Sequence, residues 1–135
     1  TPYGNGAGAL FALWMGRYYG PAAWEHVGDE VVSNVAAHLL QAATGFGTIL
    51  QAMEFALSPH REIAIVGGAL ERRPLEQAIA RSSLPWTVIA PSSDGEGLPI
   101  FEGRAPAGQP LGYVCENMTC RVPASTAEEL AAQLA

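Results

Sequence analysis

The two cysteines of this chain, Cys115 and Cys120, are separated by four residues and follow the last apolar run of the sequence. If a strand ends near Cys115, a turn can bring Cys120 back within the roughly 5.5–6 Å Cα separation that a disulfide needs. The pair would then be capable of thiol–disulfide exchange. The plainer interpretation, which we favour from the sequence, is two small thiols packed beside a strand, because free cysteine often behaves as a small hydrophobe.

A zinc site at the cysteines is a third alternative. Zinc would require two further ligands, and neither a histidine nor another cysteine lies nearby in the sequence. The three histidines, His26, His38 and His60, all lie far upstream. We therefore predict no metal and no cofactor.

Gly67 and Gly68 form a weaker candidate for a ligand site. They follow the apolar run Ile63–Val66, and in open parallel sheets ligands bind beyond the carboxyl ends of the strands. That edge of a sheet would also collect three polar residues from a second strand end, Ser92, Ser93 and Asp94. The alternative is a pair of turn glycines beside a solvated loop, which needs no ligand.

Asn5 lies in a glycine-rich opening segment, residues 4–8. The Gly-x-Gly-x-Gly spacing differs from a dinucleotide-binding loop, which also needs a strand before it. Asn5 is more simply a helix cap, with neighbouring glycines that allow close helix packing.

Residues 1–58 are predicted to be helical, as about three helices. The first contains Leu10 and Arg17 and ends at Gly20, and Pro21 is well placed to begin the second. A third, short helix runs from Ile49 to Leu57. Apolar residues at helical spacing predict the buried face of the second helix: Val27, Val31, Val35, His38 and Ala42.

Residues 59–135 predict a small α/β unit. Ile63–Val66 and Trp86–Ala90 are short apolar runs that indicate buried strands, and Pro91 closes the second. A helix opening at Pro74 lies between them, so the segment is long enough for a parallel βαβ crossover.

The rest of this segment predicts a long loop over residues 91–110, then a third strand from Leu111 to Cys115. The Ser-x-x-Glu spacing of Ser125 and Glu128 indicates a capping box that opens a C-terminal helix. The predicted fold class is thus mixed α and α/β: about three helices, then a small, mostly parallel three-stranded sheet with crossover and C-terminal helices.

Composition limits the function classes. Hydrophobic residues make up 49% of the chain and charged residues only 15%, below the usual quarter, so part of the apolar surface is expected to lie against something else. The chain also begins without methionine, and we interpret it as a piece of a longer polypeptide. All seven cations are arginines and the net charge is −6, which argues against nucleic-acid binding.

No apolar run approaches the roughly 18 residues of a membrane span. Two cysteines are too few for a secreted disulfide scaffold, so the predicted location is the cytoplasm.

Three segments together resemble the C-terminal end of the thioredoxin-domain-containing family that includes spermatogenesis-associated protein 20. They are Thr1–Gly6, the strand Glu62–Gly67, and the Tyr-Val-Cys-x-Asn-x-Thr-Cys run at 113–120, followed by Pro123 and a Glu-Glu-Leu helix. The resemblance implies a much longer protein, with an N-terminal thioredoxin-like domain and a helical barrel similar to six-hairpin glycosidases. Residues 1–58 would be the last barrel helices, with residues 59–135 as an appendix and the remainder of the chain as the partner.

This resemblance leaves three functions open. The fragment completes the barrel and its interfaces without catalysing a reaction alone, which we favour. Alternatively it belongs to a carbohydrate-active enzyme whose catalytic groups lie mainly elsewhere, with Asn5 facing a sugar-binding cavity. In the third alternative, Cys115 and Cys120 exchange electrons with the thioredoxin-like domain. A fourth and less specific alternative is a standalone ligand-binding α/β domain.

Overall fold

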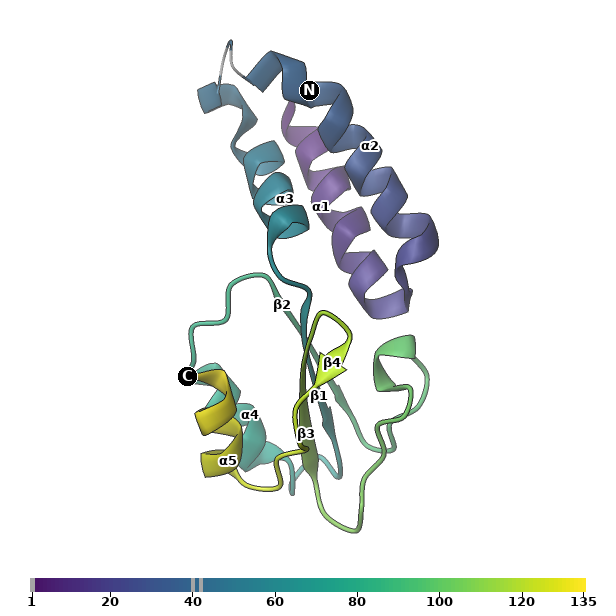
Figure 1. The fold of residues 1–135 in the computed structure, drawn as a ribbon, viewed down its shortest axis with the longest axis vertical. Coiled ribbons are helices and arrows are strands. Elements are labelled where there is room, and N and C mark those ends of the chain that lie inside the picture. Colours follow the sequence, from purple (N-terminus) through teal and green to yellow (C-terminus); the bar gives the residue numbers. More distant parts are fainter. Residues whose placement is uncertain (1, 40, 42) are drawn as a thin grey trace. The chain divides into compact units, whose positions relative to one another are not determined.

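The computed structural model describes residues 2–39, 41 and 43–135, and the chain divides into two compact units (Figure 1). We call Thr1–Ser58 the helical unit and Pro59–Ala135 the α/β unit. Among the described residues, no helix combines the length and the apolar character needed to cross a membrane.

The helical unit has three α-helices, with α1 between α2 and α3 in Figure 1. Gly20 separates the first two helices with a φ of 99°, a conformation that glycine adopts easily, and Pro21 begins α2 as predicted. The elements are α1 (Pro2–Tyr19), α2 (Pro21–Leu39), the 3₁₀ turn η1 (Ala43–Phe46) and α3 (Gly47–Leu57).

The three helices pack through aromatic and small residues. The fully buried Phe55 of α3 stacks on Trp14 of α1 with 4.7 Å between ring centroids, and the Arg17 guanidinium lies 4.9 Å from the Phe55 centroid. Gly28 lets α2 approach α1 closely, because a Cβ atom there would lie 2.6 Å from Leu13 Cγ. The described buried apolar residues of this unit are Ala9, Ala12, Leu13, Leu39, Ile49, Ala52 and Phe55.

The predicted buried face of α2 is wrong at Val27 and His38, while Val31 and Val35 are half-buried. Val27 is 48% exposed and His38 is exposed, whereas Gly28 and Leu39 are buried. The close approach at Gly28 turns this neighbouring stripe towards α1, and hydropathy could not reveal it because glycine carries no apolar side chain. The last residue of the predicted stripe, Ala42, lies outside the described residues.

The α/β unit has a mixed four-stranded sheet in the order β2-β1-β3-β4. Its strands are β1 (Arg61–Val66), β2 (Thr87–Ser92), β3 (Leu111–Glu116) and β4 (Thr119–Cys120). β1 pairs parallel with β2 and antiparallel with β3, and β3 pairs antiparallel with β4. The mixed fold class is confirmed, but the prediction of a mostly parallel, three-stranded sheet is wrong.

The predicted βαβ crossover is confirmed, since β1, α4 (Arg73–Ala80) and β2 follow one another and the two strands are parallel. β2 does not close at Pro91, as predicted, but continues to Ser92. A proline is tolerated there because β2 is an edge strand, where an outward-facing N–H is not needed for pairing.

The two faces of the sheet have different coverings. Ile63 and Ile65 of β1 belong to a buried cluster that includes Leu75 of α4 and Leu130 of α5 (Ala127–Leu134). Alternation along the strand therefore directs Glu62 to the opposite face. In Figure 1 the segment after β2, with its 3₁₀ turn η2 (Pro99–Phe101), lies on that opposite side of the sheet.

The capping box of the last helix lies one residue later than predicted. Thr126 accepts a hydrogen bond from the Glu129 backbone N–H, and the Glu129 carboxylate accepts one from the Thr126 backbone N–H. Ser125 instead donates its hydroxyl and backbone N–H to the same carboxylate. Glu128 is therefore not the capping acid.

Candidate functional site

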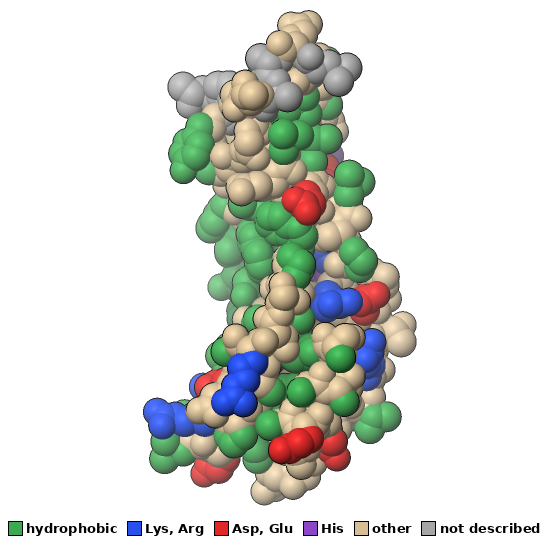
Figure 2. Space-filling view, turned by 90° about the vertical axis from the view of Figure 1, so that its left-hand side faces the viewer, with side chains coloured by type: hydrophobic (Ala, Val, Ile, Leu, Met, Phe, Trp, Pro, Cys, Tyr) green, Lys and Arg blue, Asp and Glu red, His purple; other side chains and the backbone are tan. Residues whose placement is uncertain are grey.

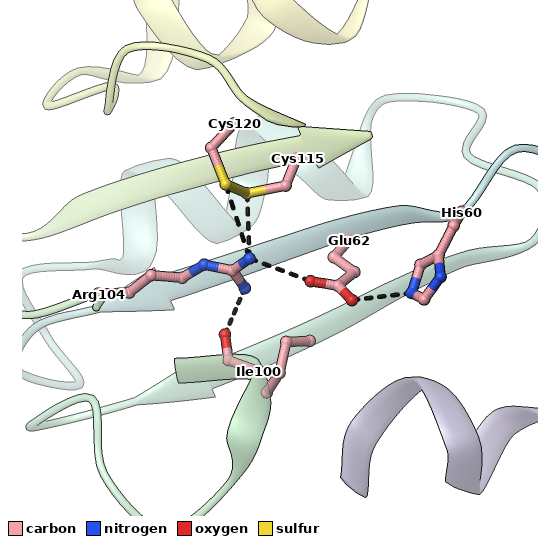
Figure 3. Close-up of a disulfide and its surroundings, with 6 residues drawn as sticks. All are labelled: His60, Glu62, Ile100, Arg104, Cys115 and Cys120. Atoms are coloured by element: carbon pink, nitrogen blue, oxygen red, sulfur yellow. Dashed lines mark hydrogen bonds and ion pairs between the residues drawn. A yellow bond between two sulfur atoms is a disulfide. The ribbon is translucent and has the colours of Figure 1, made fainter. Parts of the chain in front are cut away.

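Cys115 and Cys120 form a disulfide across the β3–β4 hairpin (Figure 3). The two residues are register partners in the antiparallel pair. Asn117 and Met118 make the two-residue turn, both with positive φ, which is the backbone that this tight hairpin type requires. The favoured interpretation of two separate thiols is wrong, and the alternative of a turn that brings the cysteines together is confirmed.

The two cysteine residues differ in exposure. Cys115 is 2% exposed and lies on β3, a central strand paired on both sides. Cys120 is exposed and lies on the two-residue edge strand β4. Among the described residues, no group of three or more His, Cys, Asp or Glu side chains is placed to hold a metal ion.

The guanidinium of Arg104 lies against the disulfide, as Figure 3 shows. Its Nη2 atom is 3.1 Å from Cys115 Sγ and 3.7 Å from Cys120 Sγ. The same nitrogen donates to Glu62 Oε2 at 3.0 Å, and Nη1 donates to the backbone carbonyl of Ile100. Arg104 is thereby fixed between a carboxylate, a backbone carbonyl and two sulfurs.

Glu62 supplies the counter-charge for Arg104 and also pairs with His60. Its Oε1 atom lies 2.8 Å from His60 Nε2 (Figure 3). Burial alone raises the pKa of the Glu62 carboxyl, but hydrogen bonds and positive charge from His60 and Arg104 outweigh burial and lower it below its ordinary value. Glu62 is therefore ionised at neutral pH, and His60 Nε2 must carry the hydrogen in their bond.

The strand register explains why these groups meet. Glu62 is the register partner of Cys115 across β1 and β3, so both side chains lie on the same face of the sheet. The hairpin tip is held to the start of β1 by two hydrogen bonds: Asn117 N–H donates to the His60 carbonyl at 2.8 Å, and His60 N–H donates to Asn117 Oδ1 at 3.1 Å. This pairing fixes the disulfide relative to His60 and Glu62.

The Arg104 guanidinium would interact more strongly with a cysteine thiolate than with the disulfide. A disulfide sulfur is only a weak acceptor for the Arg104 N–H groups, whereas a thiolate in the same place would form an ion pair with them. The cation therefore stabilises an anion that exists only after the S–S bond opens. A disulfide that acts only as a staple gains little from such a neighbour.

The sequence-predicted Gly67 and Gly68 line a separate cavity of about 290 Å³. Glu71 and Ser93 also line it, with residues from the end of the long loop, Pro106, Gly108, Gln109 and Pro110. Of the other residues expected at this edge, Ser92 donates its hydroxyl to Asp94 Oδ1 at 2.9 Å and closes a turn. Hydrogen bonds from the Glu96 backbone and the Ser92 side chain lower the pKa of Asp94. Ser92 and Asp94 therefore stabilise the turn.

Asn5 does not cap α1, because the helix begins three residues earlier at Pro2. It is exposed and belongs to the helical unit, whereas the other candidate residues belong to the α/β unit.

Sequence reasoning missed Arg104, Glu62 and His60 as parts of the cysteine site. One usable signal was Glu62, a carboxylate directly before the apolar run Ile63–Val66, which needs a partner when that strand is central. Arg104 gave no comparable signal, since it lies in a loop rich in glycine and proline. His60 lies far upstream of the cysteines in the sequence, and its side chain is only 24% exposed.

Comparison with known proteins found no matching family model, no matching curated protein and no matching solved structure. The resemblance to the thioredoxin-domain-containing family therefore stays a prediction.

Proposed function

We propose that the α/β unit is a thiol–disulfide exchange module, in which Cys115 and Cys120 pass two electrons to or from a dithiol partner. The observation that carries this proposal is the Arg104 guanidinium, held by Glu62 within 3.0 Å and directed at both sulfurs. In the exchange, a partner dithiol is oxidised to a disulfide and the Cys115–Cys120 disulfide is reduced to two thiols. The two protons released by the partner's thiols balance the two that the cysteines take up.

The partner that fits this chemistry is the thioredoxin-like domain implied by the family resemblance. On this proposal the chain is the C-terminal portion of a longer thioredoxin-linked protein, and the disulfide is a reversible electron store. A disulfide with that role must open without unfolding the sheet. This requirement distinguishes it from a structural staple.

The test is a redox titration of the 135-residue chain in thiol–disulfide buffers at neutral pH. Thiols are counted by alkylation, and the fold is followed by circular dichroism. We expect a reduction midpoint above about −300 mV, the value below which structural disulfides typically lie, with the circular dichroism unchanged. A lower midpoint, or reduction only together with loss of structure, would overturn the proposal.

A matched pair of variants sharpens the test. Arg104→Gln removes the cation beside the sulfurs, while Arg61→Gln removes an arginine that pairs with Glu116 on the same sheet. Arg104→Gln should move the midpoint to a more reducing potential, because the reduced form loses its ion pair. Arg61→Gln should leave it in place.

A second function is proposed for the helical unit, which we infer completes an α/α barrel formed by the remainder of its own longer chain. The supporting observation is the set of large apolar side chains that this unit exposes: Tyr3, Phe11, Tyr19, Trp24, Val27, Leu50 and Leu57. A carbohydrate-active role stays a prediction that no contact among the described residues favours.

The test for the helical unit is the solution behaviour of the chain alone. We expect binding of a hydrophobic dye by the native chain and self-association in sedimentation experiments, because the exposed apolar side chains would then form a surface that packs against a partner. A monomer that does not bind the dye would contradict the proposal.

A further inference from the structure

We infer that the disulfide is chemically asymmetric: a partner thiolate attacks Cys120, and Cys115 is the leaving sulfur whose thiolate Arg104 stabilises. This inference rests on the proposed exchange function and assigns each sulfur its role. It follows from three differences between the two cysteines: their exposure, the strands that carry them, and their distances to Arg104.

Exposure decides which sulfur a nucleophile can reach. Attack on a disulfide proceeds along the S–S axis, so the attacking thiolate must approach from beyond the sulfur that it joins. Cys115 is 2% exposed, whereas Cys120 is exposed along with its chain neighbours Thr119 and Arg121. Approach is therefore open at Cys120 and closed at Cys115.

The strands decide which sulfur can move after the bond opens. β3 pairs with β1 from Leu111 to Glu116, over its full length, so Cys115 stays in place. β4 consists of two residues at the sheet edge and can be displaced while Cys120 carries the partner in a mixed disulfide. The fixed cysteine then remains beside the guanidinium, ready to attack Cys120 and release the partner.

Arg104 decides where the electron pair is best accommodated. Its Nη2 atom lies 3.1 Å from Cys115 Sγ but 3.7 Å from Cys120 Sγ. A buried thiolate at Cys115 would be costly alone, because burial disfavours the charged form, and the adjacent cation offsets that cost. Glu62 holds Arg104 in position and so acts as a positioning residue.

A partner thiolate forms a new S–S bond to Cys120 Sγ, the Cys115–Cys120 bond breaks, and its electron pair leaves on Cys115 Sγ. The second thiolate of the partner then attacks the partner sulfur of the mixed disulfide and releases Cys120. The reverse sequence, through the same mixed disulfide, oxidises the cysteines.

The test uses the native oxidised chain and glutathione as the attacking monothiol. After brief exposure the reaction is quenched with acid, and mass spectrometry determines which cysteine carries glutathione. The single-cysteine variants Cys115→Ser and Cys120→Ser provide a second measurement, the rate at which each remaining thiol exchanges with oxidised glutathione. We expect glutathione on Cys120, and exchange at least about tenfold faster at Cys120 than at Cys115.

Arginine variants test the role of the cation. Arg104→Gln should slow attack on the native disulfide by about tenfold, the rate change for a barrier increase of about 1.4 kcal/mol. Arg104→Lys, which keeps the charge, should recover part of that loss. Arg121→Gln is the matched control, since it removes an arginine adjacent to Cys120 that donates to the Gln133 carbonyl. Its rate should equal that of the native chain.

The outcomes separate this inference from the function on which it rests. Glutathione on Cys115, equal labelling of both cysteines, or an Arg104→Gln rate equal to that of the native chain would overturn the inference while exchange itself stands. No exchange at all in the folded native chain would remove the proposed function.

Discussion

The helical unit and the α/β unit differ in how many charged residues they carry and in how many large apolar side chains they expose. Residues 1–58 hold five of the charged residues and residues 59–135 hold fifteen. On the face seen in Figure 2, hydrophobic side chains are prominent over the helical unit, and blue and red side chains gather over the α/β unit. The α/β unit forms ion pairs between strands and between loop and strand, such as Arg61–Glu116 and Arg104–Glu62. Among the described residues it exposes three large apolar side chains, Leu70, Met118 and Val122, whereas the helical unit exposes seven.

We infer from this difference that the two units have different roles. The α/β unit closes its own core, from β1 to α5, and places an arginine and a carboxylate beside a disulfide. The helical unit has a core of few large side chains and an apolar exterior, which suits a segment that packs against neighbours. The low charge of the chain is thus most pronounced in residues 1–58.

The largest expected effect is the loss of the helical core. Phe55→Ala removes a fully buried ring that stacks on Trp14, and a substitution of this kind costs about 3–5 kcal/mol of unfolding free energy. We expect the helical unit to melt at a much lower temperature while the rate of glutathione exchange at the disulfide is unchanged. Thermal unfolding by circular dichroism, with thiol counting on the same samples, measures both. A parallel loss of exchange would show that the two units depend on each other.

The next largest effect compares two arginines of the α/β unit. Arg104 and Glu62 are only 13% and 14% exposed, so Arg104→Met leaves a largely buried carboxylate short of its cation and should cost about 2–3 kcal/mol. Arg61 and Glu116 are 37% and 42% exposed, and Arg61→Met should cost less than about 1 kcal/mol. Denaturant unfolding of both variants measures the difference. Equal losses would mean that the Arg104 pair is no more than a surface contact.

The sequence predicted features of the fold that depend on neighbouring residues and missed those that depend on contacts between distant segments. Gly20 and Pro21 end one helix and begin the next through their own backbone preferences, and both were recognised. The direction of β3 was not, because a strand after a loop of nearly twenty residues carries no sign of its orientation. β4 has only Thr119 and Cys120, too few residues to show a pattern.

The residues of the candidate site show the same contrast between local and long-range features. The cysteines are separated by only four residues and were identified from that spacing. Glu62 and Arg104 are 42 residues apart and meet only because the loop crosses the sheet face on which Glu62 and Cys115 lie in register. No pattern in either segment predicts this contact.

A smaller effect is expected from acid. Since the pKa of Glu62 is lowered in the folded chain, its ionised form stabilises the fold. That contribution is fully present above the unfolded pKa of about 4.3 and is lost as the pH falls through the lower, folded pKa. Glu62→Gln should therefore be less stable than the native chain at pH 6, with a gap that narrows as the pH falls below about 4. Denaturant unfolding at a series of pH values measures that gap, and a constant gap would contradict the assignment.

The smallest effect concerns the exposed side chains of the helical unit, and it tests most directly whether the two units have different roles. Leu57 ends α3 and is 83% exposed, so it gains little from burial within this chain. Leu57→Gln should change the unfolding free energy by less than about 0.5 kcal/mol, as surface substitutions usually do. If the apolar exterior serves association, the same variant should bind less hydrophobic dye and self-associate more weakly. Leu75→Gln, at a buried position in the α/β unit, is the matched control and should strongly destabilise the fold. A Leu57 variant that lost stability without any change in association would mean that its side chain serves the fold, and the contrast between the two units would then be one of degree.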